Sequence, residues 1–289
     1  MKTFLPLLPL MVACSPLCHA TVLIADFNDL TTGALQTKAG GTGFSGTWSG
    51  SANPAVFAGD LTSSLYSRPQ SGTSQLLRGT NSGSVRQNFR AVATSPAGEV
   101  WFSFLTRVDE TNTGLSFESA GISLNPSSTS TPFDNLGNFY VVHTGDTIEY
   151  SFGAGTAGVV TGLAGGVVGA NSTQYSGLFV GRLVINGSGA ADTVSVWYNP
   201  DLTANPDITS YTPFYSSSSV NALDAITTLG AATYQTGNLG GGELDNILFS
   251  DGGGDSAQAF FDVTGVPEPG STTLLALAAA AAFSRRRRR

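Results

Sequence analysis

The chain has 289 residues, of which 41% are hydrophobic and only 11% are charged, under half of the share of about 25% that is usual in soluble domains. Glycine is abundant, with 36 residues, and the residues that favour helices are sparse outside the two ends. This composition excludes a helical bundle and a cytosolic α/β enzyme of ordinary make-up. The short apolar runs spread along the chain also exclude a disordered protein.

The formal net charge of −7 hides a more acidic body. Residues 1–20 hold one Lys, and residues 267–289 hold five Arg and one Glu, so the stretch between them has 7 basic and 19 acidic residues and a net charge of −12. Nucleic-acid binding needs a basic face, so we expect no nucleic-acid partner. An acidic body repels its own copies and attracts divalent cations, which fits a secreted protein.

The first 20 residues, MKTFLPLLPLMVACSPLCHA, have the pattern of a secretory signal peptide. Lys2 supplies the positive start, residues 4–12 form an apolar stretch too short for a stable span, and residues 18–20 form a small-x-small cleavage site. We therefore predict cleavage by signal peptidase after Ala20. The alternative is a lipoprotein signal with Cys14 as the lipidated first residue. Cleavage after Ala20 removes both cysteines of the chain, which excludes disulfides and cysteine-based metal sites.

Between Thr21 and Gly265, short apolar runs alternate with Gly, Ser, Asn and Pro, and several have the two-residue period of half-buried strands. Near the middle of the chain, Val100, Phe102 and Phe104 share one face of such a run, and the side chains between them share the other. The predicted strands are residues 22–27, 75–77, 85–92, 100–108, 121–124, 139–143, 147–152, 178–185, 193–198, 225–229, 244–249 and 259–263.

A hairpin is predicted where residues 178–185 and 193–198 flank the segment Asn186-Gly187-Ser188-Gly189. Glycine and asparagine readily adopt the positive φ angles that a tight hairpin turn requires. Since no linker or change of composition divides residues 21–265, we expect them to form one all-β domain.

Four parts of this body resemble a concanavalin A/laminin-G-like jelly roll. They are ADFND at residues 25–29 followed by GFSGTW at 43–48, then VWFSFL at 100–105, VSVWYNPD at 194–201 and ELDNILF at 243–249. The resemblance implies that residues 21–265 fold as an antiparallel β-sandwich.

The last of these segments bears on catalysis. A glycosidase needs two carboxylates that face each other across the sugar, and laminarinase-type enzymes on this fold carry Glu-x-Asp-x-x-Glu on one strand. Here Glu243 and Asp245 are followed by Leu248 where the second Glu would stand. The role of general acid is therefore vacant, and we predict no catalytic residues and no enzymatic activity, with a glycan-active enzyme as the least favoured alternative.

A structural calcium ion is a candidate cofactor. Asp26, Asn28 and Asp29 offer oxygen ligands at the end of the first predicted strand, and Asp262 on the last one could complete the site. The alternative is that these side chains are solvated turn residues. The segment Asp251-Gly-Gly-Gly-Asp255 does not have the spacing of a calcium-binding loop.

A sugar-binding platform is the second candidate site. Aromatic rings can stack on sugars, and Trp48, Trp101, Trp197 and Tyr140 could together line one face of the sandwich. The alternative is that these side chains belong to the core.

Residues 266–289, VPEPGSTTLLALAAAAAFSRRRRR, resemble the PEP-CTERM sorting signal of bacterial exosortase substrates. The motif is Pro267, Glu268 and Pro269, followed by an apolar stretch at residues 272–283. The stretch would span about 18 Å as a helix, against a hydrocarbon core of about 30 Å. A cytoplasmic stop follows, formed by Arg285, Arg286, Arg287, Arg288 and Arg289. The alternative is an ordinary tail anchor, or an arginine run that binds anionic lipid.

Together these patterns predict a signal peptide (1–20), a β-sandwich (21–265) and a sorting signal with a short transmembrane helix (266–289). We expect an exported, non-enzymatic surface or extracellular-matrix protein, anchored transiently in the inner membrane and then placed in the envelope or outside the cell. Its expected partners are signal peptidase, exosortase and extracellular polysaccharide. A glycan-binding module of the same fold is the alternative function.

Overall fold

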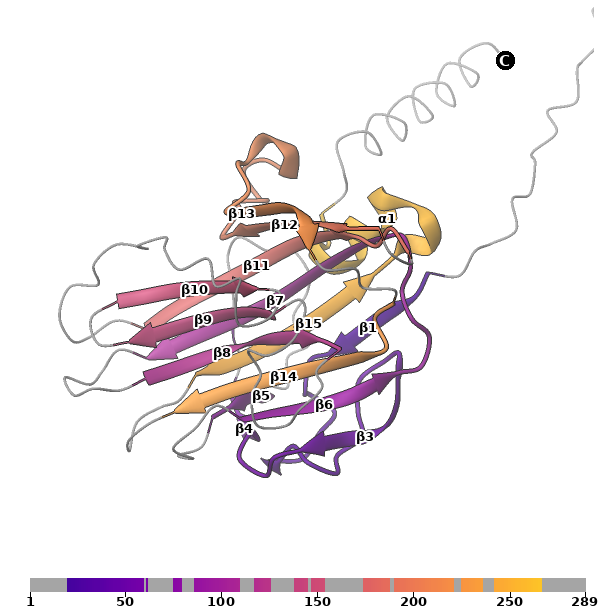
Figure 1. Cartoon of the computed structure of the whole chain (residues 1–289). Coiled ribbons are helices and arrows are strands. Elements are labelled where there is room, and N and C mark those ends of the chain that lie inside the picture. The colour runs from indigo at the N-terminus through magenta and orange to yellow at the C-terminus, as the bar shows by residue number, and fades with distance from the viewer. Residues whose placement is uncertain are drawn as a thin grey trace, which may run out of the picture.

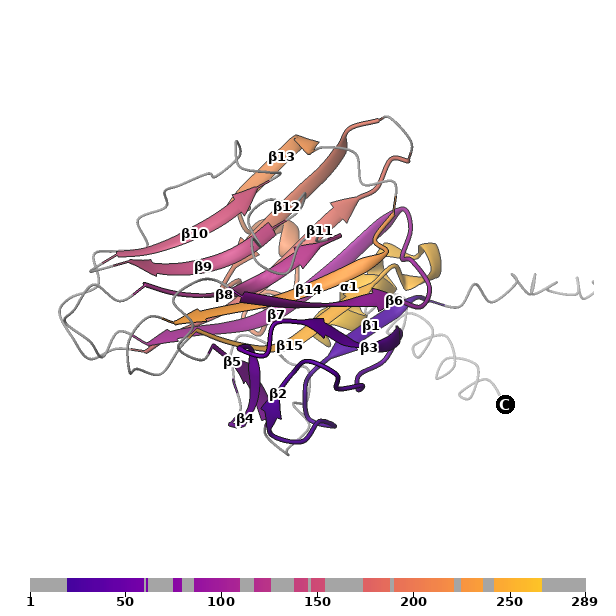
Figure 2. The same ribbon diagram turned by 60° about the horizontal axis from the view of Figure 1, so that its bottom comes forward.

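The computed structural model describes residues 20–59, 61, 75–79, 86–109, 117–125, 138–144, 147–153, 174–187, 190–220, 225–235 and 242–266. Within these residues the chain forms two antiparallel β-sheets packed face to face and one α-helix, α1 (Ser256–Thr264) (Figures 1 and 2). The predicted antiparallel β-sandwich is confirmed. Residues 1–19 of the signal peptide, and the sorting segment from residue 267 onward, lie outside the described residues.

The larger sheet, sheet A, has nine strands with β7 and β15 near its centre. Its order is β13 (Tyr215–Val220), β12 (Asp192–Tyr198), β11 (Gln174–Val184), β7 (Glu99–Asp109), β15 (Glu243–Ser250), β5 (Gln75–Arg78), β4 (Ala55–Ala58) and β2 (Gly33–Ala34). The ninth strand, β1 (Val22–Ala25), also pairs with β15: β5 covers the first residues of β15, and β1 covers residues 247–250. The first strand of the body therefore lies beside the last.

The smaller sheet, sheet B, has six strands. Its order is β10 (Thr147–Gly153), β9 (Asn138–Thr144), β8 (Phe117–Leu124), β14 (Thr228–Gln235), β6 (Arg86–Val92) and β3 (Phe44–Gly50). Strand β14 lies between β8 and β6, although both are distant from it in the sequence (Figure 1). This arrangement depends on long-range pairing that no local pattern specifies.

The main core fills the space between the two sheets. Phe102 and Phe179 enter it from sheet A, and Ile122 and Leu229 enter it from sheet B, all without exposed surface. The ring centroid of Phe102 lies 4.9 Å from that of Phe139 on β9. Aromatic rings bury large areas and add favourable ring contacts, so this cluster contributes much of the stability of the sandwich.

Strand β7 is buried on both of its faces. As predicted, Phe102 and Phe104 share one face, and Trp101 and Leu105 share the other. The first pair points into the main core, and the second pair points to the other side of sheet A. There they join a second apolar cluster, which α1 covers. Its members are Leu61, Leu76, Trp101, Leu105, Leu178, Val180, Trp197, Leu202, Ile208, Leu248, Ala259, Phe260, Val263 and Val266. Sheet A is thus the middle layer of the molecule, with sheet B on one face and α1 on the other.

The predicted strand at residues 259–263 is wrong, because these residues belong to α1. The Asp255 side chain caps the start of the helix by accepting hydrogen bonds from the backbone N–H groups of Ala257 and Gln258. Gly265 ends the helix with a φ of 71°. Asp at the N-cap and Gly after the last turn are helix signals, but they flank an apolar run short enough to be mistaken for a strand.

Four strands, β2, β3, β4 and β13, lie where the sequence predicted none. Strand β13 has the sequence YSSSSV and pairs with β12 at the edge of sheet A. Strand β3 is rich in Gly and Ser and pairs with β6 across an irregularity between Ser45 and Ser49. Small polar residues have weak strand propensity, so the pairing with a stronger neighbour decides the conformation of these segments.

The predicted hairpin is confirmed. Strands β11 and β12 pair in register from Phe179 opposite Tyr198 to Val184 opposite Thr193. In the described part of the turn, Gly187 has a φ of 77°, and the backbone N–H of Asn186 donates to the Asp192 carboxylate at 2.8 Å. The side chain of Asp192 is fully buried, so this hydrogen bond joins the two ends of the turn on its buried side.

We expect Gly181→Ala to destabilise the protein. Gly181 on β11 lies opposite Phe102, and a Cβ at this position would lie 2.0 Å from Cζ of the Phe102 ring. Because that ring is fully buried, the free energy of unfolding should fall by about 1–3 kcal/mol, the usual cost of overpacking. Urea denaturation measures this change.

Ser195→Ala, on the half-exposed face of the neighbouring strand β12, is the matched control and should change the free energy of unfolding by less than about 0.5 kcal/mol. Equal stability of Gly181→Ala and the parent chain would show that the Phe102 ring can move aside.

Candidate functional site

The acid that begins β15 is held between two arginines. The pairing register places Glu243 directly opposite Arg78 on β5 and opposite Arg107 on β7. Glu243 Oε1 accepts a hydrogen bond from Arg78 Nε at 2.7 Å and is ion-paired with the same guanidinium, and Oε2 is ion-paired with Arg107. The Glu243 side chain is 3% exposed. Both oxygens of this carboxylate are therefore committed to contacts within the sheet.

The second acid of the predicted pattern is also engaged. Asp245 is 1% exposed, and its carboxylate accepts hydrogen bonds from the backbone N–H groups of Leu61 at 3.2 Å and Asn246 at 2.7 Å. Asn246 has a φ of 50°, and the register of β15 on β7 shifts at this point. This bulge brings Leu248 to the same face of the sheet as Glu243 and Asp245.

Leu248 occupies the position where the catalytic pattern has its second Glu. It is 2% exposed and packs in the second apolar cluster beneath α1. A general acid must reach the leaving oxygen of a substrate and exchange a proton with it. A buried leucine can do neither. Glu243 links β15 to β5 and β7, and Asp245 links β15 to the backbone at Leu61.

The residues of the predicted calcium site are divided between two places. Asp26, Asn28 and Asp29 follow β1, whereas Asp262 lies on α1 and not on a strand. In the described residues, no three His, Cys, Asp or Glu side chains form a group that could hold a metal ion. The calcium site therefore stays a prediction.

The oxygens of these residues have partners within the chain. Asp29 accepts a hydrogen bond from the Gly41 N–H at 2.7 Å, and Asn28 accepts one from the Gln75 N–H at 2.9 Å. Asp262 accepts hydrogen bonds at 2.6 Å from the Ser250 hydroxyl and from the Gln258 side-chain amide. Burial lowers the pKa of the nearby Arg90 guanidinium, and the negative charge of Asp29 opposes that effect. These contacts fix the turn after β1 and the outer side of α1.

Two of the four aromatic residues proposed as a sugar platform meet in the second apolar cluster. The rings of Trp101 and Trp197 are stacked with centroids 5.8 Å apart, and Phe260 of α1 packs edge-on against Trp101 at 5.0 Å. The two tryptophans are 3% and 7% exposed. The Tyr211 carbonyl accepts a hydrogen bond from the Trp197 indole N–H at 3.0 Å. Helix α1 and the chain around Tyr211 therefore cover the two rings on which a sugar would have to stack.

The other two aromatic residues lie apart from this pair. Trp48 is 1% exposed and belongs to the main core, where its ring contacts those of Phe27 and Phe44. Tyr140 is on β9 in sheet B, and its side chain lies outside the described part of the structure. The three tryptophans are thus core residues, which agrees with the alternative considered for them.

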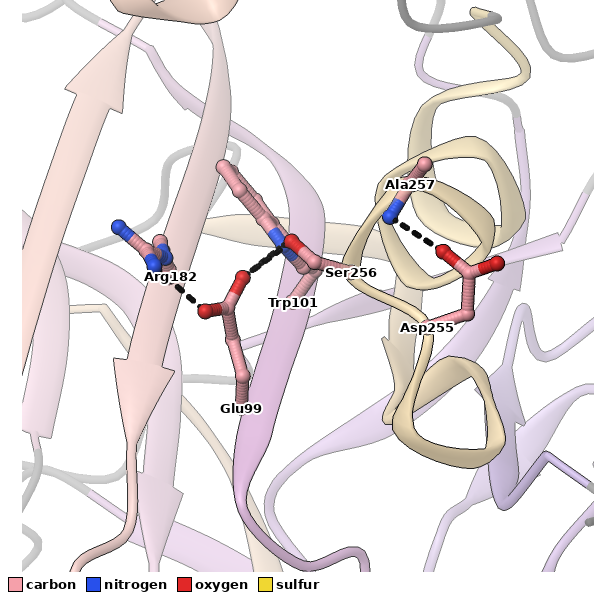
Figure 3. A network of polar contacts seen from close by, with 6 residues as sticks. All are labelled: Glu99, Trp101, Arg182, Asp255, Ser256 and Ala257. Carbon is pink, nitrogen blue, oxygen red and sulfur yellow. Dashed lines mark hydrogen bonds and ion pairs between the residues drawn. The ribbon is translucent and has the colours of Figure 1, made fainter. Parts of the chain in front are cut away.

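A polar network that the sequence did not reveal joins α1 to sheet A (Figure 3). Glu99, the first residue of β7, is paired with Arg182 of β11 at 2.5 Å and accepts hydrogen bonds from the Ser256 hydroxyl and from Trp101 Nε1. Farther along β7, the Ser103 hydroxyl donates to the Val263 carbonyl at 2.6 Å. The one sequence signal in this region is the Asp255-Ser256 pair, which is typical of a helix start but does not indicate its contacts with sheet A.

The pKa of Glu99 reflects these contacts. Burial raises the pKa of the Glu99 carboxyl, but hydrogen bonds from Arg182, Ser256 and Trp101 and the charge of Arg182 outweigh it, so that the pKa lies below its usual value. A carboxyl whose pKa is lower in the folded state stabilises the fold above its unfolded pKa. This stabilisation is lost as the pH falls through the folded pKa.

We expect Glu99→Gln to lower the Tm at pH 7, because the variant loses the charged acceptor that α1 and β11 share. The difference in Tm between the variant and the parent chain should shrink steadily as the pH falls below about 4.3, where the unfolded carboxyl becomes protonated. Thermal unfolding followed by circular dichroism at several pH values measures it. A difference that stays constant from pH 7 to about pH 2 would contradict a role for the charge.

Among the described residues, no helix is long and apolar enough to cross a membrane. The predicted transmembrane stretch at residues 272–283 lies outside them. What the structure describes is the approach to this stretch: Val266 is 5% exposed, packs in the second apolar cluster, and donates its N–H to the Thr264 hydroxyl at 3.1 Å. The folded body therefore extends to the residue before Pro267.

Several solved structures are similar to the chain at low sequence identity. A protein of unknown function from Shewanella oneidensis MR-1 is 12% identical, with a TM-score of 0.43 over 80% of this chain and 86% of that one. An alginate lyase from a Chlorella virus is 6% identical, with a TM-score of 0.36 over 64% and 88%. A GH43 glycoside hydrolase is 13% identical, with a TM-score of 0.38 over 76% and 40%. Likeness at this level says nothing about the chemistry of a site.

Comparison with protein families finds one feature, at the end of the body. No curated protein matches the chain in sequence. The model of the PEP-CTERM protein-sorting motif matches residues 265–289, beginning at the glycine that caps α1. The chain therefore carries a PEP-CTERM sorting motif, which indicates an exported protein of the envelope or the extracellular space with exosortase as its processing partner.

Proposed function

We propose that the chain is a non-enzymatic protein of the cell surface or the extracellular matrix, whose sandwich is the part that remains outside the cell after sorting. The observation that carries this proposal is the set of contacts made by the acids on β15. Glu243 is bound by two arginines, and the position of a second catalytic acid is filled by the buried Leu248. In the most enzyme-like pattern of the sequence, Glu243 thus links three strands of sheet A.

The energetics of the Glu243 cluster support a structural role. Removing a charge from water is costly, and the cost is offset only when the partner charges and hydrogen bonds are well placed. Glu243 meets this condition because the three residues lie in one row across β5, β15 and β7. The guanidinium of Arg78 also lies over the ring of Phe57 on β4, 5.1 Å from its centroid, so the row reaches a fourth strand.

The burial of sheet A on both faces supports the same interpretation. A scaffold outside the cell must stay folded there. Because the predicted mature body has no cysteine, it must do so without disulfides. Two apolar clusters, one on each face of sheet A, supply that stability through buried apolar area. The body is therefore suited to persist as a display or matrix unit.

We expect the purified chain to release no product from a panel of polysaccharides, including β-glucans and alginate. The assays would measure new reducing ends and the absorbance of unsaturated sugars, because hydrolysis gives the former and elimination gives both. Binding to the same panel, measured in parallel on a glycan array, would identify the alternative function of a glycan-binding module.

Glu243→Gln is the matched variant for this test. In a structural role it should lower the free energy of unfolding by about 2 kcal/mol, since two arginines lose their charged acceptor, and leave the polysaccharide results unchanged. Product formation that disappears in Glu243→Gln, with the variant still folded, would refute the proposal and favour a glycan-active enzyme.

The sorting motif allows a test of processing in a host that has its exosortase. Replacing Pro267, Glu268 and Pro269 with Ala should leave a longer, membrane-retained form, because the motif is lost while the apolar stretch at residues 272–283 remains. Replacing the five arginines with Ser should instead weaken the cytoplasmic stop. Mass spectrometry of the extracellular protein measures the outcome, and recovery of intact Arg289 on the parent chain would argue against exosortase cleavage.

A further inference from the structure

The residue predicted to begin the mature chain, Thr21, lies against an acid at the end of β15. The backbone N–H of Thr21 donates a hydrogen bond to Asp251 Oδ1 at 2.8 Å, and the backbone N–H of Asp251 donates to the Thr21 carbonyl at 3.3 Å. The two contacts continue the β1–β15 ladder, in which Val22 lies opposite Ser250. The position of the Thr21 nitrogen is thus tied to the end of β15 by these contacts.

The carboxylate that accepts this hydrogen bond is nearly buried, and no cation lies beside it among the described residues. Asp251 is 9% exposed. Apart from Thr21, it accepts hydrogen bonds from the backbone N–H groups of Gly253 at 2.9 Å and Ala97 at 3.4 Å. In the described residues, Glu99 and Glu243 are ion-paired with arginines, whereas no Lys or Arg lies within ion-pair distance of Asp251. A positive charge placed at hydrogen-bond distance from a nearly buried carboxylate forms a stronger contact than a neutral N–H donor does.

Cleavage of the signal peptide would change the chemistry of this contact. Hydrolysis of the Ala20–Thr21 bond consumes one water, leaves a carboxylate on Ala20, and leaves an amino group on Thr21. That group takes up a proton at neutral pH, because an α-amino group has a pKa of about 7.7–8.0. A neutral amide donor becomes an ammonium ion at the same place, and charge-assisted hydrogen bonds are roughly twice as strong as neutral ones.

We propose that removal of the signal peptide completes the fold, because the new α-ammonium group of Thr21 becomes the counter-ion of Asp251. This proposal depends on the predicted cleavage after Ala20 and is independent of the proposed function. The cut bond borders a pocket of about 260 Å³, so the additional N–H groups of the ammonium have room for water. The pocket is lined by Ala20, Thr21, Val22, Gly43, Ala93 and Thr94.

Asp251 also connects the new N-terminus to the element that precedes the sorting motif. Its side chain caps the 3₁₀ helix η3 (Gly252–Gly254), which is followed at once by Asp255, the N-cap of α1. Gly252 has a φ of 57°, and a Cβ there would lie 2.6 Å from the backbone N of Ala259 in α1. The ion pair would therefore stabilise the turn that positions α1 on sheet A, and the uncleaved chain would lack this stabilisation.

The test compares two forms of the full chain from Thr21 to Arg289, kept in a mild detergent. One form begins at Thr21 after release from a removable N-terminal fusion, and the other carries a short neutral extension that ends in the native Ala20. The extension keeps the Thr21 N–H as a neutral donor and moves the ammonium group away. We expect the extension to lower the Tm by about 3–6 °C.

Asp251→Asn provides the decisive comparison, because it keeps a hydrogen-bond acceptor and removes the charge. In this background the extension should change the Tm by less than about 1 °C. In the control Asp26→Asn, whose carboxylate accepts a 3.4 Å hydrogen bond from the Asn28 N–H, the extension should keep its full effect. An equal effect of the extension in the parent chain and in the Asp251→Asn variant, or no effect in either, would overturn the proposal. So would mass spectrometry of the exported protein that finds a first residue other than Thr21.

Discussion

The pairing of β7 with β15 in the middle of sheet A is the interaction on which the rest of the structure depends. Toward sheet B the two strands contribute Phe102 and Phe249, which face each other across the ladder with ring centroids 5.3 Å apart. On the opposite face they contribute Trp101 and Leu248 to the cluster beneath α1. Strands β11, β5 and β1 pair directly with this central pair, so both cores and much of sheet A are built on it.

Three acids with described side chains stand at the ends of these two strands. Glu243 begins β15, Glu99 begins β7, and Asp251 follows the last residue of β15. Each carboxylate has well-defined donors: two arginines for Glu243, an arginine and the start of α1 for Glu99, and backbone N–H groups for Asp251. In a chain with only 11% charged residues, these acids connect the strand ends to neighbouring strands, to α1 and to backbone N–H groups.

The same architecture brings the two ends of the body to one strand. Strand β1 pairs with the last residues of β15, and η3 and α1 follow β15 directly. The sorting motif then begins at Gly265, the cap of α1. Both predicted processing points, after Ala20 and near Pro267, lie outside the strands and the helix of the described body, so cleavage at either one leaves its paired elements in place.

The sequence by itself determined the fold class, most strands, the β11–β12 hairpin and the sorting motif, because each of these has a local pattern. Alternation in residues 100–105 also specified which side chains of β7 share a face. Local patterns do not specify what covers each face, so only the tertiary structure decided that Trp101 and Trp197 lie beneath α1 and that Glu243 meets two arginines. At the end of the body, the capping residues Asp255 and Gly265 indicate a helix, whereas the apolar run between them resembles a strand. The physical reason is that periodicity encodes the two sides of a strand, whereas burial and charge pairing depend on strands and helices that are distant in the sequence.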